Sequence, residues 1–276
     1  MKISALSKLS NLQQRIITSV LGGLFFLFCL TFNEWTYLAL ILLVSVLGQY
    51  EFYGLIREDG DDPLTKWGII NGILLNLICF FVARGDIPTK AFFFFFVLLG
   101  IIYISELYRK ASNPFENIAY TMIGVFYVAM PLALLHFASF SNGYFSFQIA
   151  SGCFFLLWAS DTGAYFAGRS FGKHKLFPRI SPNKTWEGMI GGMIASLTLA
   201  AILSNYYTDL VLWKWLVLSV IVCIGGTYGD LIESMLKRSL QIKDSGQLIP
   251  GHGGVLDRFD GLLMAAPFAA FFLMFS

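Results

Sequence analysis

The sequence predicts an all-α fold, a polytopic integral membrane bundle of about nine transmembrane helices. Its 276 residues are 57% hydrophobic and 13% charged, whereas a soluble domain carries roughly a quarter charged residues. About nine apolar stretches have the length that crosses about 30 Å of hydrocarbon. The Lys and Arg residues concentrate in alternate connections between these stretches, which is the pattern of a multi-pass membrane protein.

The predicted helices follow one another with short connections. The first comes after Lys2, Lys8 and Arg15, as in a signal peptide, but no small-residue cleavage site follows Phe32, so we expect a retained helix. Pro131 lies within the fifth, where neighbouring helices can satisfy a freed backbone group. One of the segments is also compatible with a re-entrant path. The predicted spans are residues 16–32, 35–56, 67–83, 91–108, 118–138, 147–167, 187–204, 211–232 and 260–275.

The basic residues predict the orientation of the bundle. With the N-terminus inside, the cytoplasmic connections hold 16 of the 19 Lys and Arg residues. The positive-inside rule therefore places the N-terminus in the cytoplasm and the C-terminus outside. We expect a multi-pass protein of the cell membrane, meaning the inner or plasma membrane, and no nucleic-acid partner.

Polar motifs are concentrated in the second half of the chain. We therefore divide it into residues 1–145, N-terminal transmembrane helices that form a scaffold and a possible dimer contact, and residues 146–276, a C-terminal transmembrane catalytic region with polar motifs at its cytoplasmic face. Glu51 is an exception in the first half, because it lies within an apolar helix where an ionisable group is costly. A site-lining role and a helix-packing role are both open for this carboxylate.

A stripe of polar side chains ends the eighth predicted span. Its members are Asp230, Glu233, Ser234, Lys237 and Arg238, whose spacing places them on one helical face. An ordinary helix end, in which cations complement the helix dipole, would explain Lys237 and Arg238. It does not explain Asp230, which directly follows the apolar stretch VIVCIGGTYG.

A second carboxylate pair, Asp257 and Asp260, follows the glycines of GHGG at a spacing of three residues. Hard oxygen ligands without cysteine or paired histidines suit Mg²⁺ much better than Zn²⁺. The predicted metal ligands are Asp230, Asp257, Asp260 and Glu233.

Four cations flank these carboxylates and suit phosphate groups: Lys237, Arg238, Lys243 and Arg258. Carboxylates, Mg²⁺ and fixed cations together are typical of transfer at a phosphate, where catalysis depends on positioning and charge neutralisation. Glycines lie on both sides of His252 and include Gly253 and Gly254. They let the backbone approach an anion closely, although a tight turn is an open alternative. For His252, a phosphate contact and a structural role are both open.

The connection SPNKTWEG adds cations near the predicted membrane surface. Pro182 and Asn183 predict a turn, while Lys184 and Arg179 offer positive charge. A basic interfacial loop attracted to anionic lipid is the alternative interpretation. Asp161, at the end of the sixth span, is expected to belong to a polar network or to bind a ligand. The sequence contains neither a P-loop nor a GxGxxG or HExxH motif.

The stretch from Ser234 to Asp260, SMLKRSLQIKDSGQLIPGHGGVLDRFD, resembles the signature of phosphatidate cytidylyltransferases, also called CDP-diacylglycerol synthases. All the signature positions match across these 27 residues, and SDTGAYFAGRSFGKHKL and SPNKTWEG are also similar to the family. The resemblance covers roughly residues 155–260. In the first half, only the hydrophobic pattern and the QYE around Glu51 match. In the family, the aspartates that correspond to Asp230 and Asp257 are associated with the metal centre.

The resemblance implies transfer of the cytidylyl group of CTP to phosphatidic acid with Mg²⁺, forming CDP-diacylglycerol and pyrophosphate for phospholipid biosynthesis. It also implies a homodimeric membrane enzyme whose polar cavity opens to the cytoplasm. A CTP-dependent kinase of polyprenol or another lipid alcohol would need the same groups, and a transporter would instead place its charges at the bilayer midplane. The expected catalytic residues are Asp230, Lys237, Arg238, Lys243, Asp257 and Arg258, and the expected substrate-binding residues are Asp161, Ser181, Asn183, Lys184, Ser234, Asp244, His252, Gly253 and Gly254.

Overall fold

The computed structural model describes residues 11–242, 245–246 and 253–276, and of residues 11–20 and 58 it describes the backbone alone. Its helices are α1 (Asn11–Thr31), α2 (Glu34–Glu58), α3 (Thr65–Arg84), α4 (Phe92–Leu107), α5 (Pro114–Ile123), α6 (Met130–Ser139), α7 (Phe147–Phe171), α8 (Trp186–Tyr206), α9 (Leu212–Ser239) and α10 (Leu256–Phe275). A short 3-10 turn (Thr89–Ala91) precedes α4, and a π-helical turn (Gly124–Ala129) joins α5 to α6.

The predicted all-α bundle of about nine helices is confirmed for the described residues, because α5, the π turn and α6 form one continuous helix. Seven helices there are long and apolar enough to cross a membrane. The other two helices are α1, of which only Leu21–Thr31 is described with its side chains, and α7, which carries the polar SDT sequence. Multi-pass membrane insertion follows from the seven long apolar helices.

The π turn lies just before Pro131, within the fifth predicted span. Proline has no backbone N–H, so the helical ladder is interrupted one turn earlier, where π turns are commonly found. The Tyr53 ring of α2 packs against Gly124, and its hydroxyl donates to the carbonyl of Thr121 at 2.7 Å. The interruption is therefore stabilised by a neighbouring helix, as a membrane environment requires.

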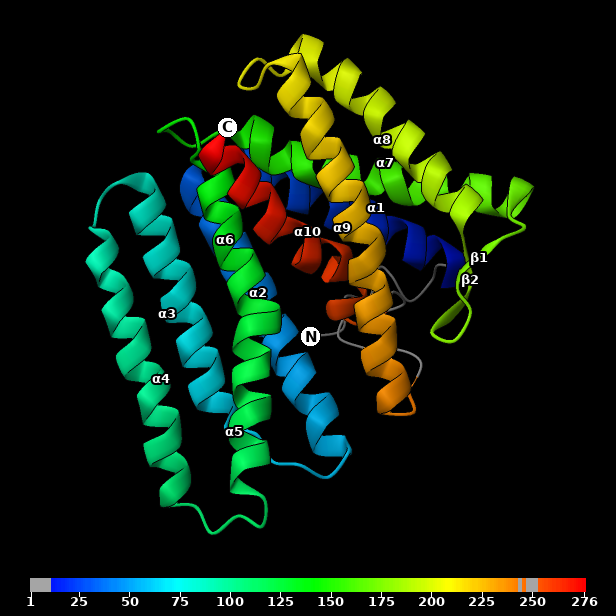
Figure 1. The fold of residues 1–276 in the computed structure, drawn as a ribbon. Helices are drawn as coiled ribbons and strands as arrows, with labels where there is room; N and C mark the ends of the chain where they lie inside the picture. The colour runs from blue at the N-terminus through cyan, green and yellow to red at the C-terminus, as the bar shows by residue number, and fades with distance from the viewer. Residues whose placement is uncertain (1–10, 243–244, 247–252) are drawn as a thin grey trace.

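The helices form two groups, with α9 and α10 between them (Figure 1). The helices α3, α4 and α5–α6 lie side by side at one end, and α7 and α8 pack together at the other. The main core joins α1, α2, α6, α7, α9 and α10, and a smaller core lies between α3, α4 and α5. The polar motifs of α7, α9 and α10 are thereby brought to one region.

The connection between α7 and α8 is a β-hairpin, which the sequence did not predict. Strands β1 (Lys175–Phe177) and β2 (Ser181–Thr185) pair antiparallel, and the turn falls at residues 178–180. The expected turn at Pro182 and Asn183 is therefore wrong, because both residues lie in β2. A two-stranded sheet has only edge strands, in which the missing N–H of proline is tolerated. Glu187 of α8 closes the hairpin by accepting hydrogen bonds from the backbone N–H groups of Lys173 and His174.

Glycines bring the backbones of α9 and α10 into direct contact. A Cβ atom on Gly225 would lie 2.7 Å from Cα of Ala265, and one on Gly229 would lie 2.8 Å from Cα of Gly261. Small residues allow this kind of close approach between membrane helices. As a consequence Asp230, the neighbour of Gly229, is held beside Asp260, the neighbour of Gly261.

Candidate active site

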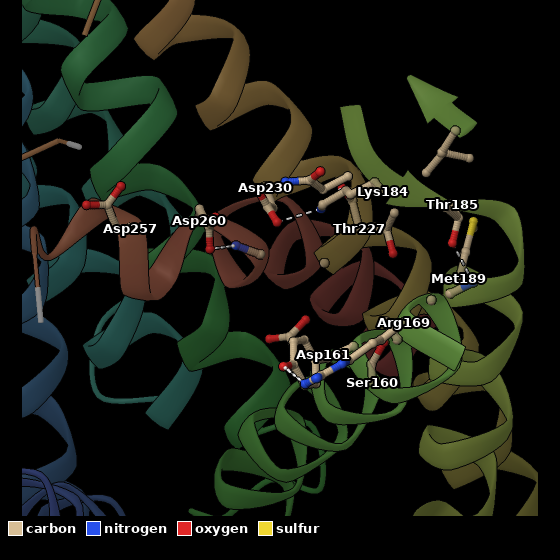
Figure 2. Close-up of a pocket in the computed structure, with 18 residues that line it drawn as sticks. Ser160, Asp161, Arg169, Lys184, Thr185, Met189, Thr227, Asp230, Asp257 and Asp260 are labelled. Carbon is tan, nitrogen blue, oxygen red and sulfur yellow. Dashed lines mark hydrogen bonds and ion pairs between the residues drawn. The ribbon is translucent and has the colours of Figure 1, made fainter. Parts of the chain in front are cut away.

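A polar pocket of about 580 Å³ opens where the hairpin meets α7, α9 and α10 (Figure 2). Four carboxylates line it, and the cations in its wall are Arg169 and Lys184. The carboxylates are Asp161, Asp230, Asp257 and Asp260. Acidic side chains therefore outnumber basic ones in the described wall, so a polyanionic ligand would enter only together with cations.

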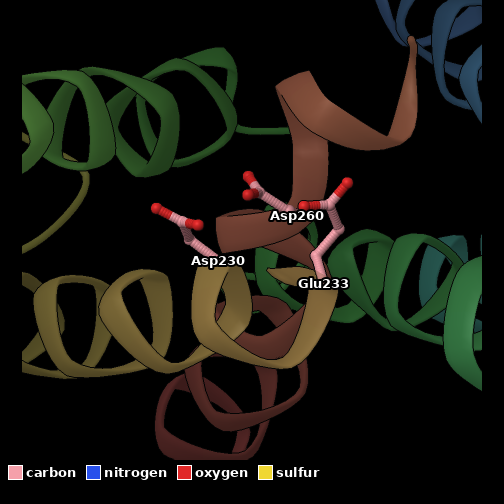
Figure 3. A group of neighbouring side chains, drawn as sticks. All are labelled: Asp230, Glu233 and Asp260. Carbon is pink, nitrogen blue, oxygen red and sulfur yellow. The ribbon is translucent and has the colours of Figure 1, made fainter. Parts of the chain in front are cut away.

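Three carboxylates form a cluster beside this pocket (Figure 3). One oxygen from each of Asp230, Glu233 and Asp260 lies within 4.8 Å of the others. The residues Asp230 and Glu233 are one helical turn apart on α9, and Asp260 faces them from the first turns of α10. The close contact of the two helices at Gly229 explains why carboxylates 30 positions apart in the sequence meet.

The chemistry of this cluster fits a divalent metal ion. Its donors are all hard carboxylate oxygens, the type that Mg²⁺ and Ca²⁺ prefer. Oε1 of Glu233 is buried and has no hydrogen-bond partner among the described residues. A buried carboxylate oxygen without a partner is costly, and a bound cation would remove that cost.

Lys184 connects the hairpin to the acidic cluster. Its Nζ lies 2.6 Å from Oδ2 of Asp230 and 3.3 Å from the carbonyl oxygen of Thr227. Figure 2 shows the Lys184 side chain directed toward Asp230. The Asp230 carboxylate also accepts a hydrogen bond at 3.2 Å from Oγ of Ser234. The predicted substrate-binding residues Lys184 and Ser234 therefore both contact a predicted metal ligand.

Asp257 has a different environment from the other carboxylates. Its Oδ1 lies 2.7 Å from Nζ of Lys237, which also forms an ion pair with Glu233. Its Oδ2 accepts hydrogen bonds from the backbone N–H of Ser245 at 3.2 Å and of Gly254 at 3.1 Å. Asp257 thus lines the pocket, and its partners include a lysine, two backbone amides and the side chain of Glu233. The carboxylate that completes the cluster with Asp230 and Glu233 is Asp260.

The other predicted residues are distributed unevenly around the pocket. Asp161 and Asn183 line it, whereas Ser181, at the start of β2, does not. Arg238 and Arg258 are exposed and lie outside the lining of the pocket. Lys243, Asp244 and His252 lie outside the described residues.

The two predicted glycines form a tight turn before α10. Gly253 has a φ of 86°, a left-handed conformation that glycine adopts without steric cost. Gly254 donates its N–H to Asp257 and packs against the side chains of Glu51 and Ser245. The amide of Gly254 is therefore engaged within the protein, as the tight-turn interpretation predicts.

Comparison with known proteins identifies the family. Residues 13–276 match the profile of the cytidylyltransferase family. This chain belongs to that family. It is 35% identical over 272 residues to the phosphatidate cytidylyltransferase of Bacillus subtilis, a match that covers 95% of this chain and 98% of that protein.

Two further relatives of this cytidylyltransferase carry the same name. The protein of Staphylococcus haemolyticus is 34% identical over 256 residues, covering 92% of this chain and 95% of that protein. The protein of Haemophilus influenzae is 41% identical over 187 residues, covering 65% of this chain and 64% of that protein. The matches to the Bacillus subtilis and Staphylococcus haemolyticus proteins extend over nearly the whole length of both chains, the N-terminal helices included.

The pocket residues that the sequence did not predict include Arg169 and Thr227. Arg169 lies eight positions after Asp161 on α7, a spacing that returns to the same helical face, so helical periodicity would have found it. Thr227 offers its backbone carbonyl to Lys184, a contact without a sequence signal. Glu51 does not line the pocket and instead accepts a hydrogen bond from the backbone N–H of Val255, just before α10.

Proposed function

We propose that this protein transfers the cytidylyl group of CTP to phosphatidic acid, forming CDP-diacylglycerol and pyrophosphate for phospholipid biosynthesis. The observation that carries the proposal is the ion pair between Lys184 and Asp230, which joins a fixed cation to an acidic cluster in one pocket. The shared name of the curated relatives supports the choice of substrates. Transfer at a phosphate requires both kinds of group close together.

The acidic cluster is the proposed Mg²⁺ site. Asp230, Glu233 and Asp260 would hold the ion, with Asp257 as a further ligand once Lys237 moves onto a phosphate. When bound, Mg²⁺ would neutralise part of the charge of the triphosphate and of the pyrophosphate leaving group.

The chain's own cations would bind the two anionic substrates. Lys237 forms ion pairs with Glu233 and Asp257, and it would be available to a phosphate of CTP if those carboxylates held a metal ion. Lys184 is the proposed partner of the lipid phosphate, because strand β2 places it in the wall of the pocket. The further proposed phosphate ligands are Arg238, Lys243 and Arg258, and the other proposed substrate contacts are Asp161, Ser181, Asn183, Ser234, Asp244, His252 and Gly253. Gly254 is left out of this set, because its amide already binds Asp257.

The reaction needs no general base. A phosphate monoester has a second pKa of about 6, so the phosphate of phosphatidic acid is already a dianion at neutral pH. One of its oxygens forms a bond to the α-phosphorus of CTP, and the bond from that phosphorus to the oxygen bridging to the β-phosphorus breaks. The role of the protein is therefore to hold two anions in line and to stabilise the departing pyrophosphate.

The placement in the membrane is part of the proposal. We propose that the pocket and the N-terminus face the cytoplasm and the C-terminus faces outside in the inner or plasma membrane, because the basic residues concentrate on one side. Residues 146–276 would carry the chemistry, residues 1–145 would form the scaffold, and two copies would form a homodimer.

Product analysis tests the proposed reaction. Purified protein is incubated with CTP, Mg²⁺ and phosphatidic acid, and lipid-linked cytidine and pyrophosphate are measured. We expect the two products in equal amounts. Release of CDP with a lipid alcohol as acceptor would support a lipid kinase. If no product forms but the protein carries a charged solute across the membrane of sealed vesicles, the result would support a transporter.

A further inference from the structure

A carboxylate from the first half of the chain reaches the start of α10. Glu51 lies on α2, and the residue is 6% exposed. Its Oε2 accepts hydrogen bonds from the backbone N–H of Val255 at 2.6 Å and of Leu256 at 3.2 Å. Its Oε1 accepts a hydrogen bond at 2.6 Å from Oγ of Ser245. A charged group buried in this way persists only where its bonds offset the cost of burial.

These bonds satisfy the first amides of α10. The first N–H groups of any helix lack an intrahelical acceptor, and a polar residue just before the helix commonly supplies one. Val255 occupies that position here and has no polar side chain. The acceptor comes instead from α2, about 200 positions earlier in the chain, and its negative charge also complements the positive end of the helix dipole.

Asp257 also binds the segment that precedes α10, by accepting hydrogen bonds from the backbone N–H groups of Ser245 and Gly254. Ser245 donates its hydroxyl to Glu51 and its backbone N–H to Asp257. Glycines make room for this arrangement, because a Cβ atom on Gly246 or Gly254 would collide with the Glu51 carboxylate. The two carboxylates therefore join Ser245 to the start of α10.

We propose that Glu51 is a positioning residue that sets the affinity of the acidic cluster for its divalent cation. It does so through the first turns of α10, which carry Asp257 and Asp260. Glu51 does not itself line the pocket. Residues that orient metal ligands in this way typically contribute about 10- to 100-fold to metal affinity. This inference rests on the proposed function, because the cation is the one that the transfer reaction would use.

The test compares Glu51 with a buried carboxylate outside the site. Glu106 on α4 is 1% exposed and accepts hydrogen bonds from Asn117 at 2.8 Å and from Arg109 at 2.9 Å. Its partners lie on α5 and in the connection before it. Glu51→Met and Glu106→Met each remove a buried carboxylate at nearly constant side-chain size, so both variants should lower the melting temperature.

The discriminating measurement is Mn²⁺ binding to detergent-solubilised protein without nucleotide, followed by electron paramagnetic resonance. We expect Glu51→Met to raise the Kd for Mn²⁺ by at least about 10-fold and Glu106→Met to leave it within about 2-fold of the wild type. Amide hydrogen exchange over residues 253–260 should become faster in the Glu51 variant alone. A wild-type Kd in folded Glu51→Met protein would overturn the inference and leave Glu51 with a packing role.

Two milder variants keep the test decisive if Glu51→Met does not fold. Glu51→Gln can still accept the backbone N–H groups while the Ser245 hydroxyl turns to accept from its amide, and Ser245→Ala removes a single bond. We expect each to raise the Kd by about 3- to 10-fold, and wild-type values in both would overturn the inference. An absence of Mn²⁺ binding to the wild type would instead contradict the cation site of the proposed function.

Discussion

Nζ of Lys184 lies 2.6 Å from Oδ2 of Asp230, so the hairpin between α7 and α8 is joined by an ion pair to the acidic cluster of α9 and α10. The lysine side chain is 24% exposed and the aspartate 44%, which leaves both within reach of a ligand in the pocket. A divalent cation bound to Asp230 would compete with the lysine for this carboxylate. Lys184 would then be released toward an incoming phosphate.

Replacement of Lys184 tests this exchange of partners. We expect Lys184→Met to lower kcat/KM by about 100-fold or more, because a fixed charge opposite a reacting phosphate is lost. Steady-state kinetics with both substrates varied would measure the effect. Lys66→Met is the control, since Lys66 lies exposed in the first turn of α3 and does not line the pocket. Equal activities of the two variants would contradict the role of Lys184.

Asp257 offers a test of the further metal ligand. We expect Asp257→Asn to abolish turnover while the protein remains folded and inserted in the membrane, because the amide keeps the size of the side chain but not its charge. Activity is measured from lipid-linked cytidine, and folding from the elution profile and melting temperature. Near-normal activity would refute the assignment of Asp257 to the metal.

The tight turn before α10 predicts a strong effect of a single methyl group. In Gly254→Ala the new Cβ atom would collide with the carboxylate of Glu51 and the hydroxyl of Ser245. We expect a lower melting temperature and loss of activity. Gly100→Ala on α4 is the control, because no atom lies within 4 Å of its added Cβ, and an alanine inside a helix stabilises by up to about 1 kcal/mol. A Gly254→Ala protein as stable and active as Gly100→Ala would contradict the close packing of Gly254 against Glu51 and Ser245.

The hairpin cations predict a dependence on anionic lipid. Lys173, Lys175 and Arg179 are exposed, and each basic residue at an anionic bilayer surface contributes about 1 kcal/mol to binding. A variant with glutamine at all three positions should raise the apparent KM for phosphatidic acid in vesicles by about 10-fold or more. The KM for CTP should change little. A larger change for CTP would assign these cations to the nucleotide.

The hydrophobic pattern predicted the helices well, because hydrocarbon imposes their length and leaves the backbone few alternatives. Every predicted span corresponds to a helix of the described structure, with α5 and α6 joined through the π turn. The hairpin was missed because five residues containing Pro182 give no strand signal of their own. A turn was therefore predicted where β2 lies.

The candidate site was predictable in its parts and not in its pairings. Helical spacing placed Asp230 and Glu233 on one face, which the structure shows. That Asp260 joins them while Asp257 pairs with Lys237 depends on how α9 and α10 pack, and no local pattern encodes this. The contact of Glu51 with the start of α10 likewise joins residues about 200 positions apart.

In cytidylyl transfer, CTP donates its α-phosphorus together with the nucleoside. The most direct measurement incubates purified protein with Mg²⁺, phosphatidic acid and CTP labelled with ³²P at either the α or the γ position, and then counts the extracted lipid. Cytidylyl transfer predicts label in the lipid from α-labelled CTP, and label in released pyrophosphate from γ-labelled CTP. Label in the lipid from γ-labelled CTP alone would contradict cytidylyl transfer and identify a kinase.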